Sequence, residues 1–101
     1  MPKDLRGFGK AIDYHKQSLA IVQKIKDKKG VSNCYLSLGS VEYKLGNFRR
    51  AIDYYLNAEN ILKQIGQIHY LKAVYDGLFF AYKKIEDHEN AEKYKELAKA
   101  K

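Results

Sequence analysis

Length, composition and cysteine content already exclude several classes of protein. The chain has 101 residues, of which 46% are hydrophobic and 31% are charged, values typical of one soluble globular domain. No apolar run approaches the length of a membrane span, and the N-terminus lacks the apolar core of a secretory leader, although a leader would be missing if the chain is a piece of a longer protein. Because Cys34 is the only cysteine, no internal disulfide can form, and we expect a reducing, cytoplasmic location.

The spacing of apolar residues predicts five helices separated by short turns. The first covers about residues 8–26 and ends before Gly30, and the second covers about residues 31–45. Gly46 can adopt the left-handed conformation that ends a helix, and Asn47 can cap the third helix, at about residues 48–64. Gly66 is expected to end that helix, and the fourth covers about residues 68–85. Asp87 can cap the fifth helix, at about residues 88–99.

The net charge of +7 lies entirely in the first half of the chain. Residues 1–50 contain eleven Lys and Arg against four Asp and Glu, whereas residues 51–101 contain eight of each. Much of the excess falls in the segment KIKDKK at residues 24–29. Lysines at the C-terminal end of a helix suit its dipole, and we favour this interpretation over a patch for nucleic acid or an acidic partner, which stays open.

The chain repeats itself with a period of 40 residues. Residues related by this step are mostly of the same type, and they include Ala11, Ala51 and Ala91; Tyr14, Tyr54 and Tyr94; Tyr35 and Tyr75; and Leu38 and Leu78. A fixed period of this length, carried by paired amphipathic helices, indicates an α-solenoid.

Residues 34–61 resemble one full tetratricopeptide repeat, which is a hairpin of two antiparallel helices. The matching positions are Tyr35, Leu38, Gly39, Gly46, Phe48, Ala51, Tyr55 and Ala58, and Tyr43 lies near the position of a further aromatic residue. Residues 74–98 resemble a second, more degenerate copy, and residues 6–21 resemble only the second helix of a copy. The period is longer than the common one of about 34 residues, and in this it resembles the repeats of kinesin light chains and of many bacterial signalling proteins.

This resemblance implies an all-α fold, an antiparallel helix-hairpin solenoid of about five helices and two and a half repeats. The single domain, residues 1–101, would divide into a half repeat at residues 6–29, a full repeat at 30–66 and a degenerate C-terminal repeat at 67–101. Ala51 is expected where the two helices of the full repeat cross closely, with Gly39 as its partner. Phe79 replaces a small residue of the family pattern, so the last hairpin should splay, and Glu42 stands where the family usually has an aromatic residue.

Nothing in the sequence indicates an enzyme, and we expect no catalytic residue, no metal and no cofactor. The three histidines, His15, His69 and His88, share no ligand-spaced motif with one another or with Cys34. His15 and His88 occupy aromatic positions of the repeat, which predicts half-buried packing roles for them.

The resemblance instead implies a groove that is lined by the first helix of each repeat and binds a peptide or helix of a partner protein. Carried over position by position, its residues would be Asn33, Leu36, Ser37, Ser40, Tyr43 and Lys44 from the full repeat, and Ala73, Asp76, Gly77, Phe80, Lys83 and Lys84 from the next. Lys44, Lys83 and Lys84 favour an acidic or polar peptide. Tyr43 and Phe80 offer aromatic contact.

The function implied is a non-catalytic protein–protein interaction module, as a segment of a signalling or regulatory protein. Nucleic-acid or polyanion binding through the basic N-terminal half is the alternative, although most of the tyrosines fit packing positions and leave few for base stacking. Members of the family that bind the C-terminal carboxylate of chaperone tails use Lys, Asn and Arg at set groove positions. Here only Asn33 is of a suitable type, and Asp76 would repel an acidic tail, so we expect no useful affinity for such peptides.

The two ends of the chain differ in polarity. The last predicted helix is polar, as the end of a solenoid in water requires. The first carries apolar residues, yet residues 1–7 are too short to supply a helix that would pair with it, so apolar surface would be exposed. We expect this end to be covered either by a second copy of the chain, in a homodimer, or by an upstream repeat. The residues predicted for self-association are Phe8, Ile12, His15 and Leu19.

Overall fold

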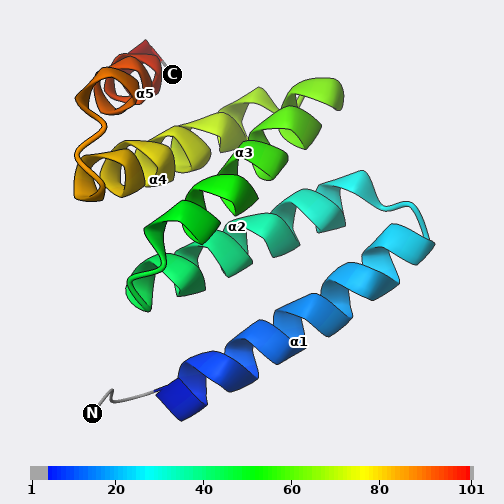
Figure 1. Ribbon diagram of the computed structural model, residues 1–101. Coiled ribbons are helices and arrows are strands. Elements are labelled where there is room, and N and C mark those ends of the chain that lie inside the picture. Colours follow the sequence, from blue (N-terminus) through cyan, green and yellow to red (C-terminus); the bar gives the residue numbers. More distant parts are fainter. Residues whose placement is uncertain (1–4, 101) are drawn as a thin grey trace.

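The computed structural model describes residues 5–100, and the side chains of residues 7–100, as helices joined by short turns (Figure 1). In chain order the helices are α1 (Leu5–Lys24), α2 (Lys28–Lys44), α3 (Phe48–Gln64), the short 3-10 helix η1 (Ile68–Tyr70), α4 (Leu71–Lys84) and α5 (His88–Ala100). The described residues form no strand, and the predicted all-α fold is confirmed. The outer limits of the predicted domain, residues 1 and 101, lie outside the described residues. None of the described helices combines the length and the apolarity that crossing a membrane requires.

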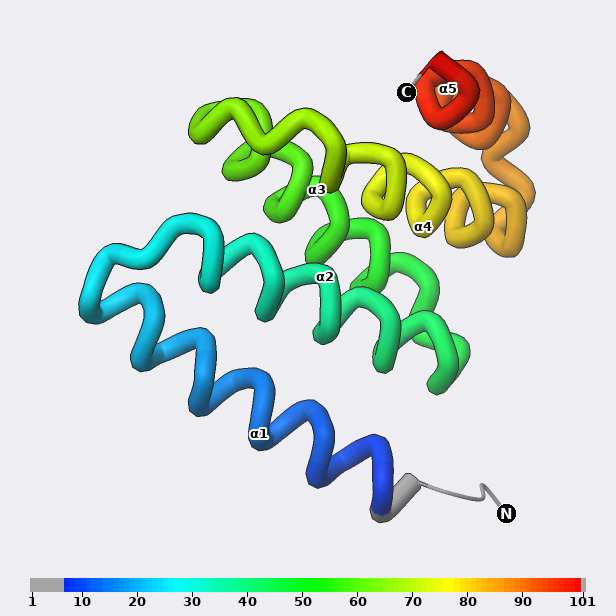
Figure 2. Tube along the Cα trace, turned by 180° about the vertical axis from the view of Figure 1, so that it is seen from behind, coloured from blue at the N-terminus to red at the C-terminus, as the bar shows by residue number. Residues whose placement is uncertain are grey.

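The helices form two antiparallel hairpins, α2–α3 and α4–α5, with α1 packed against α2 on the outer side (Figures 1 and 2). Among the described helices α1 packs only against α2, and the two hairpins meet mainly where α3 packs against α4. In Figure 2, α5 is seen nearly end-on while α4 lies across the picture, whereas α2 and α3 run side by side. The predicted splaying of the last hairpin by Phe79 stays a prediction.

The first four α-helices are each followed by a residue with left-handed backbone. The φ angle is 86° at Gly46 and 72° at Gly66, as expected for glycines that end helices. At the other two turns this conformation falls on Lys26 and Glu86, each with a φ of 61°. These two residues are forty positions from Gly66 and Gly46, so the repeat keeps its turn geometry where it lacks the glycine. The sequence analysis placed Gly30 in the break between the first two helices. This prediction was wrong, because Gly30 lies inside α2.

Two of the helices begin with an aspartate cap. The carboxylate of Asp27 accepts a hydrogen bond of 3.0 Å from the backbone N–H of Gly30, at the start of α2. The carboxylate of Asp87 accepts one of 3.2 Å from the backbone N–H of Asn90, at the start of α5, so the predicted cap is confirmed there. Asp27 was not recognised as a cap from the sequence, because the helix was expected to begin three residues later.

The prediction that Asn47 caps α3 was wrong, and the reason is a buried carboxylate. Asn47 makes no capping hydrogen bond, since its side-chain amide donates instead to the carboxylate of Glu42, at 2.8 Å. Glu42 is only 3% exposed, and a buried carboxylate without a partner would be strongly destabilising. Forty residues later the equivalent position is Tyr82, whose ring stacks on that of Tyr94. The hydrogen bond between Glu42 and Asn47 in one repeat is thus replaced in the next repeat by the packing of two tyrosine rings.

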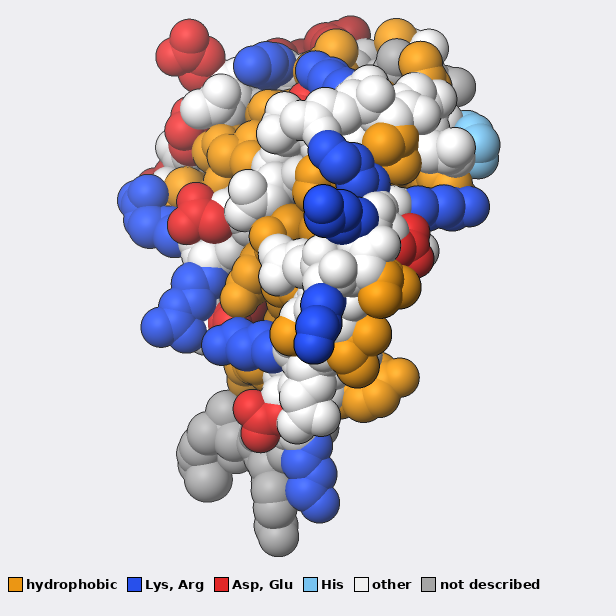
Figure 3. All heavy atoms as spheres, turned by 90° about the vertical axis from the view of Figure 1, so that its right-hand side faces the viewer, with side chains coloured by type: hydrophobic (Ala, Val, Ile, Leu, Met, Phe, Trp, Pro, Cys, Tyr) orange, Lys and Arg blue, Asp and Glu red, His pale blue; other side chains and the backbone are white. Residues whose placement is uncertain are grey.

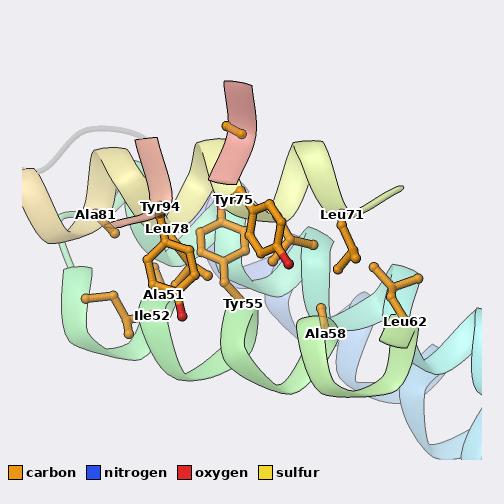
Figure 4. Close-up of a cluster of buried hydrophobic side chains, with 12 residues drawn as sticks. Ala51, Ile52, Tyr55, Ala58, Leu62, Leu71, Tyr75, Leu78, Ala81 and Tyr94 are labelled. Carbon is orange, nitrogen blue, oxygen red and sulfur yellow. The ribbon is translucent and has the colours of Figure 1, made fainter. Parts of the chain in front are cut away.

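The ring of Tyr55 lies at the centre of the core, where it projects from α3 toward α4 (Figure 4). A Cβ atom placed on Gly39 of α2 would lie 2.9 Å from this ring, and one on Gly77 of α4 would lie 2.7 Å from it. The atoms nearest to Gly39 therefore belong to Tyr55 and not to its predicted partner, Ala51. Ala51 itself is fully buried, in keeping with a tightly packed position on α3.

Three tyrosine rings pack α5 against α4 within the last hairpin, and a hydrogen bond joins α5 to α3. The ring centre of Tyr94 in α5 lies 5.7 Å from that of Tyr75 and 5.8 Å from that of Tyr82, both in α4. The hydroxyl of Tyr94 donates to the carboxylate of Glu59 in α3 at 3.4 Å, and Glu59 also pairs with Lys63 at 3.1 Å. Burial, followed by the negative charge of Glu59, raises the pKa of Tyr94 to about 12.

Candidate functional site

A cleft of about 470 Å³ lies between the C-terminal part of α2 and that of α4. Its lining residues are Tyr43, Phe80, Lys83, Lys84 and Glu86, and we refer to it as the aromatic–lysine cleft. All but Glu86 belong to the groove that the sequence predicts. Two helices that are far apart along the chain thus bring aromatic and cationic side chains to one concave place.

Aromatic packing holds the side chains of this cleft in position. The ring of Tyr43 meets that of Phe48, at the start of α3, edge to face with 5.1 Å between the ring centres. On α4 the ring centres of Phe79 and Phe80 are 4.9 Å apart. Phe79 is half-buried and packs against the core, whereas Phe80 is 50% exposed. A half-exposed ring that is supported from behind can contact a ligand without a large loss of side-chain entropy.

The two lysines of the cleft also rest on aromatic rings. The Nζ atom of Lys83 is 5.6 Å from the ring centre of Phe79, and that of Lys84 is 6.0 Å from the ring centre of Phe48. Both distances fall within the range of cation–π attraction, which restrains the ammonium groups near the cleft. The lining carries two positive charges against the one negative charge of Glu86. The local charge therefore favours a ligand with carboxylate groups.

The aromatic–lysine cleft also depends on three residues that the sequence analysis did not assign to the groove, namely Phe48, Phe79 and Glu86. The first two were assigned to packing positions of the repeat, and the packing is what supports the cleft. Glu86 could have been found from the period alone, because it stands forty residues after the turn residue Gly46.

The other predicted groove residues do not join the aromatic–lysine cleft. Asp76 lies on the opposite side of Phe80, in a cleft of about 310 Å³ that Lys72 and Lys99 also line. Its carboxylate pairs with Lys72 at 3.2 Å. The remaining predicted positions, which line neither of these two clefts, are Asn33, Leu36, Ser37, Ser40, Lys44, Ala73 and Gly77.

Two of these residues face the interior. Leu36 is half-buried and packs against the core cluster. Gly77 faces the ring of Tyr55, so its assignment to the groove was wrong. Asn33 and Lys44 are exposed on α2.

The histidines lie on different helices and the cysteine is buried. His15 is half-buried on α1, as predicted, whereas His88 is exposed at the start of α5 and its predicted packing role was wrong. His69 lies exposed in η1 beside Tyr70. Within residues 5–100 no three His, Cys, Asp or Glu side chains gather in a way that could hold a metal ion. Burial raises the pKa of the Cys34 thiol, which disfavours the reactive thiolate.

The residues predicted for self-association lie on the covered side of α1. Phe8, Ile12, His15 and Leu19 are all half-buried, and α2 is the helix that packs against α1. Among the side chains that the structure describes, the large exposed apolar ones of this region are Tyr14, Ile21 and Ile25. These residues follow helical periodicity on another face of α1. The apolar pattern was therefore visible in the sequence, but the sequence did not show which face α2 would cover.

Comparison with known families agrees with this geometry. The sequence profile described as tetratricopeptide repeat matches residues 5–64, which correspond to α1, α2 and α3. The matched region is more than half of the chain, and it leaves out the degenerate α4–α5 hairpin. No curated protein matches the chain at a significant level.

Proposed function

Because the chain belongs to the tetratricopeptide repeat family, whose repeats generally mediate binding to other proteins, we propose that it is a non-catalytic module that binds a peptide or helix of a partner. The observation that carries the proposal is the aromatic–lysine cleft, where Tyr43 of α2 meets Phe80 and two lysines of α4. We further propose that the chain works in the cytoplasm as a segment of a signalling or regulatory protein.

The chemistry of the cleft favours a ligand segment that combines an apolar or aromatic side chain with carboxylates. Phe80 and Tyr43 offer ring faces to the first, and Lys83 and Lys84 offer charge to the second. Glu86, which also lines the cleft, disfavours a segment with several adjacent carboxylates. For the same reason, and because Asp76 lies on the far side of Phe80, we expect no useful affinity for acidic C-terminal tails of the chaperone type, and titration calorimetry with such a peptide tests this.

A peptide selection tests the proposed cleft directly. The protein is used to select binders from a displayed library of random 12-residue peptides, and the winners are measured by calorimetry. We expect enrichment of an aromatic residue next to carboxylates, with affinity that falls by about 10-fold or more in Phe80→Ala and in the double variant Lys83→Glu, Lys84→Glu. Lys16→Glu, which removes an exposed lysine on α1, is the matched control and should leave affinity unchanged. Selected peptides that bind the Lys16→Glu and Lys83→Glu, Lys84→Glu proteins equally would place binding outside the cleft.

The nucleic-acid alternative makes a different prediction. If the basic half is the ligand site, retention on a heparin column should fall steeply with salt and depend on Lys26, Lys28 and Lys29. The cleft variants would then bind as the unmodified protein does. Retention that changes with the cleft variants and not with these three lysines favours the peptide site.

A further inference from the structure

One face of α1 is apolar and exposed. Tyr14 is 66% exposed, Ile21 62% and Ile25, just beyond the helix end, 66%. The spacing of these residues places them in one stripe along the helix, which we call the open face of α1. Neighbouring large side chains of α1, such as Leu19 and Val22, are half-buried toward α2.

The repeat shows what covers such a face elsewhere in the same molecule. Forty residues after the open face, α3 and its C-cap carry the same three residue types, as Tyr54, Ile61 and Ile65. All three are half-buried there. The ring centre of Tyr54 lies 6.0 Å from that of Tyr35 in α2, and Ile61 lines a small cleft together with Val31 of α2. On α3, therefore, this stripe is covered by an antiparallel helix.

The aromatic part of this contact occurs in both hairpins with the same spacing. Tyr35 meets Tyr54, and Tyr75 meets Tyr94 with 5.7 Å between ring centres. In each case the tyrosine of the second helix packs on the tyrosine of the helix before it. Tyr14 is the corresponding residue of α1, and among the described residues its ring packs only beside that of His15, at 5.4 Å.

Charge indicates the chemistry of the helix that fits. At the end of the α2–α3 contact, Lys28 donates from its Nζ atom to the side-chain oxygen of Gln64, at 3.1 Å. Forty residues before Gln64 stands Lys24, at the end of α1. A helix that covers α1 as α2 covers α3 would thus place its equivalent of Lys28 against a lysine, and an acidic residue is favoured there.

The surroundings of Lys24 strengthen this preference. Figure 3 views the molecule from the side of the turns that follow α1 and α3, and it shows Lys and Arg side chains along the centre of this side, with exposed hydrophobic side chains between them. Lys26 and Lys28 line a small cleft here with Val31 and Ile61. An acidic partner would therefore be attracted to this end of α1, whereas a second basic α1 would be repelled.

We propose that the open face of α1 binds an amphipathic helix of a partner protein, antiparallel to α1, with an acidic residue opposite Lys24 and an aromatic residue seven positions later opposite Tyr14. The register follows from α2, where Lys28 and Tyr35 make the equivalent contacts with Gln64 and Tyr54. This surface is distinct from the aromatic–lysine cleft, so the two proposals stand or fall separately.

The probe is a synthetic peptide of residues 28–45 of this chain, with Lys28→Glu to face Lys24 and Cys34→Ser to prevent oxidation. The matched control peptide keeps Lys28 and carries only Cys34→Ser. In titrations followed by ¹⁵N NMR, we expect saturable shifts at the amides of Tyr14, Ile21 and Ile25. The control peptide should bind about 3- to 10-fold more weakly at low salt, and the difference should shrink at high salt.

Protein variants separate the open face from other surfaces. Tyr14→Ala should weaken the probe by about 3- to 10-fold through loss of the aromatic pair, and Ile21→Glu should remove binding. Both positions are exposed, so neither change should unfold the protein. Phe80→Ala in the aromatic–lysine cleft should leave binding unchanged. Shifts that map to the cleft, or two peptides of equal affinity, overturn the proposal.

A tethered version covers the case in which the isolated peptide is too weakly helical to bind. The probe segment is joined to the N-terminus through a flexible Gly-Ser linker, which makes binding intramolecular. We expect a higher melting temperature than with the control segment, and Ile21→Glu, which removes binding, should abolish the gain. Equal melting temperatures overturn the proposal.

Two other occupants have their own signatures. A homodimer in sedimentation equilibrium that Ile21→Glu dissolves would show that a second copy covers the face. Flotation with phosphatidylserine vesicles that Ile21→Glu abolishes would show a membrane. Either result overturns the proposal of a partner helix.

Discussion

Replacing Gly77 by alanine tests how tightly the core is closed around Tyr55. The added Cβ atom would lie 2.7 Å from the Tyr55 ring, well inside ordinary van der Waals contact. The ring cannot move away freely, because a Cβ built on Gly39 would already lie 2.9 Å from it and the side chain is 7% exposed. Overpacking of this kind costs about 1–3 kcal/mol, and the clamped ring places Gly77→Ala in the upper part of that range.

Helix propensity acts in the opposite direction and must be subtracted. Alanine is favoured over glycine inside a helix by about 1 kcal/mol. The net expectation for Gly77→Ala is therefore a loss of about 1–2 kcal/mol in the free energy of unfolding, or a melting temperature lower by roughly 4–16 °C. Urea unfolding followed by circular dichroism measures both the midpoint and its slope.

Gly9 supplies the matched control, because it lies inside α1 with no atom within 4 Å of an added Cβ. Gly9→Ala should raise the free energy of unfolding by about 0.5–1 kcal/mol. A second check is the double variant Gly77→Ala, Tyr55→Leu, in which the smaller side chain leaves room and the two losses should not add. If Gly77→Ala stabilises the protein as Gly9→Ala does, the ring is not clamped and the account of the core is refuted.

Three further predictions follow from the described geometry. Ala51→Leu should destabilise by about 1–3 kcal/mol, because Ala51 is fully buried and α3 has no room there; an unchanged melting temperature would show a loose interior. Glu86→Gly should stabilise by about 0.5–1 kcal/mol by relieving the left-handed backbone, as Gly46 does forty residues earlier, while Glu86→Ala should not. Because the folded pKa of Tyr94 lies at about 12, above the ordinary value of 10, the unfolded state loses its proton first, and stability should fall by about 2–3 kcal/mol between pH 10 and 12. Tyr94→Phe should lessen this alkaline loss in urea midpoints measured across that range.

Helical periodicity and the 40-residue step were enough to predict the five α-helices and their order. The turns were harder to predict, because Lys26 and Glu86 have left-handed backbone although lysine and glutamate rarely end helices in this way. The same step does reveal them once Gly46 and Gly66 are accepted as helix ends. Asn47 was misjudged for another reason, since the buried partner that redirects its amide, Glu42, belongs to the preceding helix.

The candidate cleft was predictable only in part. Tyr43, Phe80, Lys83 and Lys84 line one cleft, because they lie near the C-terminal ends of two first helices and the hairpins bring those ends together. That this cleft binds a partner stays a prediction. For positions nearer the middle of these helices, whether a side chain faces the cleft or the core depends on how each helix is rotated about its axis. That rotation is set by contacts of individual side chains with the neighbouring helices. Gly77 illustrates the point, because the Tyr55 ring from the preceding hairpin turns that side of α4 toward the core.

Repetition makes one part of the molecule a physical control for another. Tyr54 on α3 and Tyr14 on α1 are the same residue at the same place in the period, yet the first is half-buried and the second is 66% exposed. Sequence cannot be the cause of this difference, so the cause is the neighbour, which is α2 in one case and solvent in the other. The same comparison sets the chemistry of a suitable neighbour, since Gln64 accepts a hydrogen bond from a lysine whereas Lys24 favours a carboxylate. Comparison with α3 thus gives the proposed partner helix of the open face a register and a direction, which a chance hydrophobic patch would lack. It also identifies one difference in charge, which is Lys24 in place of Gln64.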